Sequence, residues 1–232
     1  MPRYTSAYSS LVIRLKEVTI LVDNASRLER KDPMKYRAYV NACCRGAIVL
    51  LCSHLEGYIE ELGTSILEKL HSKKVDRSRM ADILFYHISR NRFEELFQKQ
   101  DPKARAEWMF EFISQDLEYW SKSGRFANPI DPKIFNKGFA TPRVGDIAKY
   151  LKRFGYNDYI KDLNHKLTAS SLIIQNTINH MVDTRNSIAH GDNYITKTPT
   201  EVSEIISSTS LFCNTTDVVL GDWCKRKFCS IR

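Results

Sequence analysis

The sequence predicts an all-α protein, and two observations support this prediction. Apolar residues recur at intervals of three and four along most of the chain, which is the spacing of one buried helix face. No stretch alternates between apolar and polar residues for long enough to indicate a β-strand. The chain has 232 residues, of which 43% are hydrophobic and 27% are charged, so it can bury one substantial core. We therefore expect residues 1–232 to form a single helical domain.

The first part of the chain predicts two helices separated by a short break. The first is expected over residues 8–28. Asp32 followed by Pro33 marks the start of the second, because proline is favoured in the first turn of a helix. This second helix is expected over residues 33–70 and should be the spine of the core. Its apolar stripe consists of Ile48, Leu51, Leu55, Ile59, Leu62, Ile66 and Leu70.

The helical pattern loosens over residues 71–156, which we interpret as an insertion into the domain. Two helices are expected there, over residues 77–98 and 103–122, and a shorter one over residues 144–154. Prolines and glycines gather between residues 124 and 145, which is typical of a loop. Aromatic side chains more often pack in a core than stack on bases. We expect core packing of Phe93, Phe97, Trp108, Phe110, Phe112, Tyr119 and Trp120.

The C-terminal part predicts two further helices with well-marked ends. One begins near Thr168 and ends at Gly191, because glycine is favoured just past a helix end. The other opens at Thr198, which is followed by a proline and, three residues after the cap, by Glu201. This is the pattern of a capping box, so the boundary of the last helix is well defined.

The segment from Arg185 to Asp192 combines a permanently charged guanidinium with a titratable imidazole. A histidine transfers protons near neutral pH, and an arginine holds the negative charge that builds on a phosphate under attack. RNA cleavage through the ribose 2′-hydroxyl needs these two groups and no metal or cofactor. The segment predicts Arg185 and His190 as catalytic residues, with Asn186 orienting the phosphate or the ring. Asp192 or Glu56 would fix the tautomer of the imidazole.

Arg185 and His190 do not readily face one phosphate from a single helix. Their separation of five residues turns the two side chains apart by roughly 140°. A symmetric second copy would place two residues of each kind around one cleft, so the spacing favours a homodimeric site. The simpler interpretation is structural: Arg185 caps carbonyls at the helix end and pairs with Asp192, while His190 interacts with the helix dipole.

The motif and the helices around it resemble HEPN domains. Residues 185–191, Arg-Asn-Ser-Ile-Ala-His-Gly, are close to the R-x4-6-H motif of the RiboL-PSP type. Residues 55–60 resemble the second-helix region of that family, where an acidic residue commonly lies. With the helix order, the resemblance covers about residues 8–70 and 160–228 and leaves the middle insertion unmatched. It implies an up-and-down helical bundle that dimerises through its motif helices and acts as a metal-independent endoribonuclease.

Carried over to this chain, the resemblance implies Arg185 and His190 as the catalytic pair, with Asn186 beside the arginine. It implies Glu56 as the second-helix acid, although two other glutamates follow within five residues and leave this alignment open. Members of the family often serve as toxins or as effectors of antiviral and stress defence. An antitoxin or other regulator would be a separate partner, because no such domain is fused within these 232 residues.

Charge and cysteine usage limit the partners and the compartment. A formal net charge of +8 favours polyanions such as RNA. The six cysteines lack the close C-x-x-C spacing of a zinc site, so we expect free thiols and no metal. Neither a membrane span nor a secretory signal is recognisable, which favours the cytoplasm and no membrane role.

Two alternatives to a ribonuclease stay open. One is a non-catalytic HEPN scaffold that binds RNA or a protein partner through the same fold. The other is a general nucleic-acid-binding helical protein that relies on charge alone, for example on the basic cluster of residues 73–79. Charge runs of this kind are usually solvated faces, and purely electrostatic binding would survive removal of His190.

Overall fold

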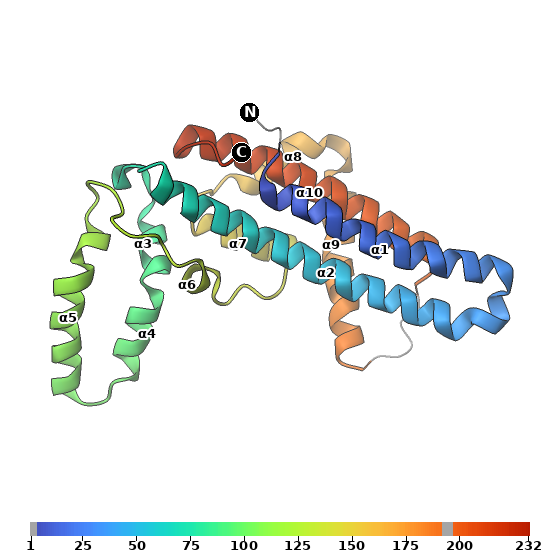
Figure 1. Ribbon diagram of the computed structural model, residues 1–232, viewed down its shortest axis with the longest axis horizontal. Helices are drawn as coiled ribbons and strands as arrows, with labels where there is room; N and C mark the ends of the chain where they lie inside the picture. The colour runs from blue at the N-terminus through green and yellow to red at the C-terminus, as the bar shows by residue number, and fades with distance from the viewer. Residues whose placement is uncertain (1–3, 192–196) are drawn as a thin grey trace.

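The computed structural model describes residues 4–191 and 197–232, except for the side chains of residues 115–119. Throughout these residues the regular structure is helical and no strand occurs, which confirms the all-α prediction. The long helices of the bundle are α1 (Ser6–Lys31), α2 (Pro33–Ser72), α9 (Ser171–Ala189) and α10 (Pro199–Lys227) (Figure 1). The shorter helices are α3 (Asp82–Ile88), α4 (Arg90–Gln98), α5 (Pro102–Trp120), α6 (Pro132–Asn136), α7 (Val144–Lys152) and α8 (Tyr159–Leu167), with 3-10 turns at Arg77–Arg79 and Thr168–Ser170.

Helix α2 is the spine of the bundle, as the sequence predicts, and its start is set locally. The side chain of Asp32 caps the helix by accepting a hydrogen bond from the backbone N–H of Lys35 at 3.0 Å, and Pro33 occupies the first turn. Helices α1, α9 and α10 all pack against α2, and Leu51 and Leu55 on its inner side are completely buried. By length and hydropathy α2 could also cross a membrane, but here it serves as a core helix between its three neighbours.

Two polar contacts fix helix α10 in the bundle. The predicted capping box is present: the Thr198 hydroxyl accepts from the backbone N–H of Glu201 at 3.2 Å, and the Glu201 carboxylate accepts from the N–H of Thr198 at 2.8 Å. Further along, the fully buried Asp217 accepts a hydrogen bond from the backbone N–H of Thr5 at 3.1 Å. Burial raises the pKa of Asp217, and the hydrogen bonds from Thr5 oppose this less strongly. These hydrogen bonds join the start of α1 to α10, a contact that the sequence did not predict.

The middle segment differs from its prediction in several places. Residues 77–98 do not form one helix but a 3-10 turn followed by α3 and α4. The backbone is extended at Met80 and Ala81, and that of Ser89 leaves the helical region at ψ 4°. Helices α6 and α8 were not predicted at all. Helices α4 and α5 form a hairpin that projects from the bundle (Figure 1), so only part of its surface is covered. The expectation of core packing is therefore wrong for Phe97 and Phe110, which are 80% and 77% exposed, and for the exposed Trp120, whereas Trp108 is buried. The side chain of Tyr119 lies outside the described residues.

Candidate functional site

The motif lies at the C-terminal end of α9. The sequence of this helix determines which face is buried and where the helix ends. Ile174, Ile178 and Met181 are buried at intervals of four and three, which fixes one face of α9 against the core. The helix ends as predicted: His190 is its cap residue, and Gly191 follows with φ +88°. Apart from its two chain neighbours, no described residue has an atom within 4 Å of the position that a Gly191 side chain would occupy. Glycine is therefore required here by the left-handed backbone and not by crowding.

Arg185 points towards α2, where it meets Glu56. Its Nη2 atom lies 3.6 Å from Glu56 Oε2, and the two side chains are 24% and 29% exposed. The same nitrogen donates a hydrogen bond to the backbone carbonyl of Ala140 at 3.3 Å. The guanidinium thus lies in a fixed, half-buried position between an acid on α2 and a loop carbonyl.

Arg185 offsets only part of the increase in the pKa of Glu56. Burial is the first cause that raises the pKa of Glu56, the neighbouring Glu60 is the second, and Arg185 opposes both by a smaller amount. Burial also raises the pKa of Glu60. Two half-buried carboxyl groups one helical turn apart therefore lie beside a single arginine next to the motif.

Cys52 lies beneath this cluster, one turn before Glu56 on α2. It is completely buried, and its Sγ atom lies 3.7 Å from the carbonyl of Met181. Burial raises the pKa of Cys52 to about 12, although Arg185 acts in the opposite direction. The thiol therefore stays protonated near neutral pH and is a packing residue, not a nucleophile.

One loop segment holds the outer side of α9, and sequence reasoning missed it. This segment, residues 140–144, is called the strap below. Its Arg143 forms an ion pair with Asp183, and the backbone N–H of Val144 donates to Asn179 Oδ1 at 3.1 Å. Asn179 and Asp183 are four residues apart and so share a helix face. That polar face was the one available signal in the sequence, because its partner lies about 40 residues earlier in the chain.

His190 is separated from Arg185 in the monomer. The residue is exposed at the end of α9, and its ring makes no hydrogen bond or ion pair with any described residue. Its backbone N–H donates to the carbonyl of Asn186 at 3.0 Å, and Asn186 itself is half-buried. The structure therefore brings Arg185 together with Glu56 and leaves the exposed His190 ring without a partner among the described residues. Asp192 lies outside the described residues.

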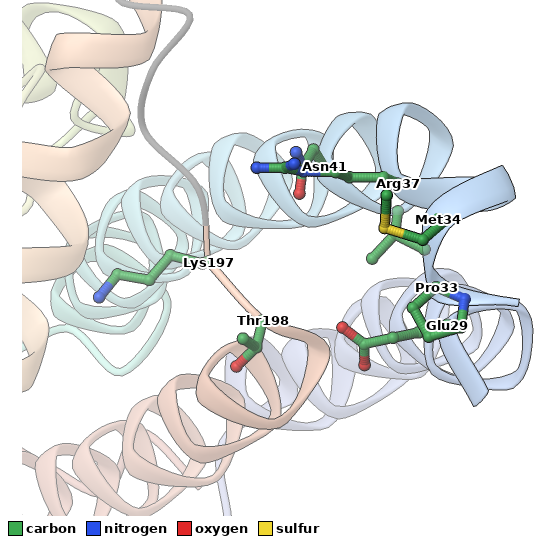
Figure 2. Close-up of a pocket in the computed structure, with 8 residues that line it drawn as sticks. Glu29, Pro33, Met34, Arg37, Asn41, Lys197 and Thr198 are labelled. Carbon is green, nitrogen blue, oxygen red and sulfur yellow. The ribbon is translucent and has the colours of Figure 1, made fainter.

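The cavity shown in Figure 2 does not coincide with the motif. It lies where α1 gives way to α2, beside the start of α10, and has a volume of about 330 Å³. Lys197, one of its two cationic residues, already pairs with Glu201 at 3.0 Å. Arg185, His190 and Glu56 are not among its lining residues, which are Glu29, Pro33, Met34, Arg37, Val40, Asn41, Lys197 and Thr198.

The described part of the chain contains no group of three or more His, Cys, Asp or Glu side chains arranged to hold a metal ion. All six cysteines are free thiols, five of them buried and Cys229 partly so. Burial raises the pKa of Cys44 to about 11, as it does for Cys52. The chemistry available at the motif is thus that of a guanidinium, an exposed imidazole and two adjacent carboxyl groups.

Comparison with known proteins identifies the family of the chain. A family model described as RiboL-PSP-HEPN matches residues 9–222. The match extends across residues 71–156, which the motif-based resemblance had left unmatched. Neither the curated proteins nor the solved structures contain a significant match to the chain.

Proposed function

The chain belongs to the RiboL-PSP-HEPN family, and we propose on that basis that it is a metal-independent endoribonuclease that acts as a homodimer. The observation that carries the proposal is the geometry of the motif. Arg185 is held in a defined position by Glu56 and Ala140, while His190 is exposed at the end of the same helix. Phosphodiester cleavage needs a positioned cation and a side chain that can accept and donate protons.

In the proposed reaction, His190 accepts the proton of a ribose 2′-hydroxyl as the oxygen attacks the adjacent phosphorus. The O2′–P bond forms and the P–O5′ bond breaks, and the partner's His190 gives a proton to the leaving 5′-oxygen. Arg185 stabilises the negative charge that builds on the phosphate oxygens, and Asn186 orients the phosphate or the imidazole. The products carry a 2′,3′-cyclic phosphate and a 5′-hydroxyl. Positioned acid–base groups contribute about 10²–10⁴-fold to such a reaction.

The surface of α2 supports the homodimer. Ala42, Val49 and Ser53 are exposed at intervals of seven and four, so they lie on one side of the helix. This side leads directly to Glu56, one turn nearer the motif. A second copy packed here would bring two motifs towards one cleft, with the exposed His190 of each copy beside it.

A non-catalytic HEPN scaffold that binds RNA or a protein partner is the second candidate. The observation in its favour is that Arg185 already has two partners in the monomer, Glu56 and the Ala140 carbonyl. In a scaffold these contacts would serve packing alone. In the nuclease, a phosphate would have to compete with them.

We place the protein in the cytoplasm, without a membrane role. We expect it to act as a toxin or as an effector of antiviral or stress defence, controlled by a separate antitoxin or another regulatory partner. Support for these roles comes from the family resemblance alone.

The decisive experiment incubates end-labelled RNA with the protein in excess EDTA. His190→Ala and Arg185→Ala should abolish cleavage, and the products of the wild type should end in 2′,3′-cyclic phosphates. His180→Ala is the matched control, because His180 is an exposed histidine on the same helix. If the wild type is folded and dimeric yet cuts no RNA in a broad panel, the scaffold function is correct instead.

A further inference from the structure

Two basic runs that are far apart in the sequence meet at one end of the bundle. Helices α2 and α10 both end there, as Figure 1 shows. Arg79 Nη2 donates a hydrogen bond to the carbonyl of Arg226 at 3.2 Å, and Cys229 Sγ lies 3.9 Å from the carbonyl of Lys69. We call the exposed cationic residues gathered here the basic end: Lys73, Lys74, Arg79, Lys225, Arg226 and Lys227.

The charges of the basic end are not neutralised. Among the described residues, none of its six side chains forms an ion pair, whereas Lys137 pairs with Glu94 and Lys149 pairs with Asp146 elsewhere on the surface. Two acids of the same chain segments have other partners: Asp76 accepts a hydrogen bond from the Ser78 N–H, and Asp222 pairs with Arg232 at 3.2 Å. Ion pairs among the described residues therefore do not offset the positive charge of the basic end.

The ends of the two helices account for part of this charge. Each helix C-terminus carries a partial negative charge of roughly half an electron, which attracts lysine and arginine. Two helix ends therefore explain about one unit of positive charge, and six cations exceed this several-fold. The excess creates a surface that attracts polyanions.

We propose that the basic end is a second RNA-binding surface, which holds phosphates remote from the reacting one. The choice of RNA rests on the proposed function. An anionic membrane is less well matched, because no large apolar side chain in residues 69–79 or 222–232 is exposed. Peripheral membrane sites usually combine basic residues with apolar ones that enter the bilayer.

The position of the basic end determines its effect. Lys73 follows Glu56 by 17 residues on α2, which corresponds to about 25 Å at the rise of an α-helix. Contacts at that distance act equally on bound RNA and on the transition state. The basic end should therefore lower KM and leave kcat unchanged.

Binding of a fluorescent single-stranded RNA, measured by anisotropy over a series of salt concentrations, tests this inference. All proteins carry His190→Ala so that the RNA stays intact. The double variants Lys73→Gln/Lys74→Gln and Lys225→Gln/Lys227→Gln remove two charges each, from α2 and from α10. Each should reduce the slope of log affinity against log salt by about 1.4, because a single strand contributes roughly 0.7 per phosphate contact.

The matched control is Lys103→Gln/Lys149→Gln, which removes two exposed lysines that already have acidic partners. It should keep the original slope. An unchanged slope in either basic-end variant overturns the inference. So does a loss of binding to phosphatidylserine vesicles with unchanged RNA binding, which would identify a membrane partner.

The binding assay is independent of catalysis, so the two proposals fail separately. If the protein cleaves RNA and the double variants keep its KM, the basic end is not an RNA site and the proposed function stands. If the protein cleaves no RNA but the double variants show the predicted smaller slope of log affinity against log salt, the basic end binds RNA and the protein is a scaffold.

Discussion

Replacing Glu56 by glutamine tests the arrangement of the motif most directly. The substitution keeps the size of the side chain and removes one negative charge 3.6 Å from the Arg185 guanidinium. Loss of an ion pair usually destabilises a protein, but burial and Glu60 raise the pKa of Glu56 more than Arg185 lowers it. Folding therefore makes the charged form of this side chain less favourable than it is in the unfolded chain. We expect Glu56→Gln to leave the free energy of unfolding at neutral pH unchanged or slightly increased.

The effect on RNA binding should be larger. Two unit charges about 4 Å apart interact by about 1 kcal/mol in water and more at a partly buried site. Exposed pairs measured by mutation give 0–1 kcal/mol, so we use about 1 kcal/mol for the repulsion between Glu56 and a phosphate on Arg185. Its removal should tighten RNA binding by about fivefold. Turnover should fall, because the guanidinium loses the carboxylate that fixes its direction.

The assay compares RNA affinity on the His190→Ala background with kcat in the otherwise native protein. The control is Glu60→Gln, which removes a second half-buried carboxyl group from the next turn of α2. It should change affinity less, because Arg185 is not among the groups that shift the pKa of Glu60. If Glu60→Gln tightens binding more than Glu56→Gln, the second-helix acid is Glu60. If Glu56→Gln weakens binding, the guanidinium does not receive the phosphate.

Three further predictions concern stability and are measured by thermal unfolding. Gly191→Ala should lower the unfolding midpoint by about 2–4 °C, because a backbone at φ +88° costs alanine about 1 kcal/mol of strain. Gly191→Asn should lower the midpoint less than Gly191→Ala. If the wild type and Gly191→Ala unfold at the same temperature, the left-handed turn at Gly191 is wrong. Gly63→Ala should destabilise the protein by about 1–2 kcal/mol, because the new methyl group overlaps the buried Tyr150 hydroxyl. This net loss includes a gain of about 1 kcal/mol in helix propensity. In a Tyr150→Phe background the same substitution should destabilise the protein less. Burial, Arg153 and Arg90 lower the pKa of His87 to about 4, from 6.5. The unfolded chain therefore takes up the proton first, stability is lost as pH falls from 6.5 towards 4, and His87→Gln should flatten that part of the profile.

Local signals in the sequence predicted the parts of the fold that depend on neighbours in the chain. The stripe of α2, the glycine stop after His190 and the capping box at Thr198 all involve residues within about four positions of each other. The structure agrees with each of them. Where contacts come from distant segments, prediction failed. The hairpin of α4 and α5 looks amphipathic in sequence, but nothing in the pattern shows that it stands away from the bundle and exposes Phe97 and Phe110.

The candidate site shows the same division. The motif residues were recognisable because they lie within one turn or two of each other. Glu56 was named as a candidate acid, but its pairing with Arg185 was not predicted, since it precedes Arg185 by 129 positions and Glu60 and Glu61 have the same local character. Only the packing of α9 on α2 selects among these acids. The strap was missed entirely, because an ion pair between residues 143 and 183 leaves no periodic trace.

Helix geometry also explains why one copy of this chain offers an incomplete site. Arg185 must face α2 to reach Glu56, and a residue five positions later is turned away from it by roughly 140°. The His190 side chain therefore does not face a phosphate on Arg185 of the same copy while α9 remains packed as it is. Repositioning α9 would expose Met181 and Ile178, which are buried in the core, at a cost of about 1.5–3 kcal/mol for each side chain. Bringing in a second motif through the exposed side of α2 requires no such change, so assembly is the less costly way to unite the two groups.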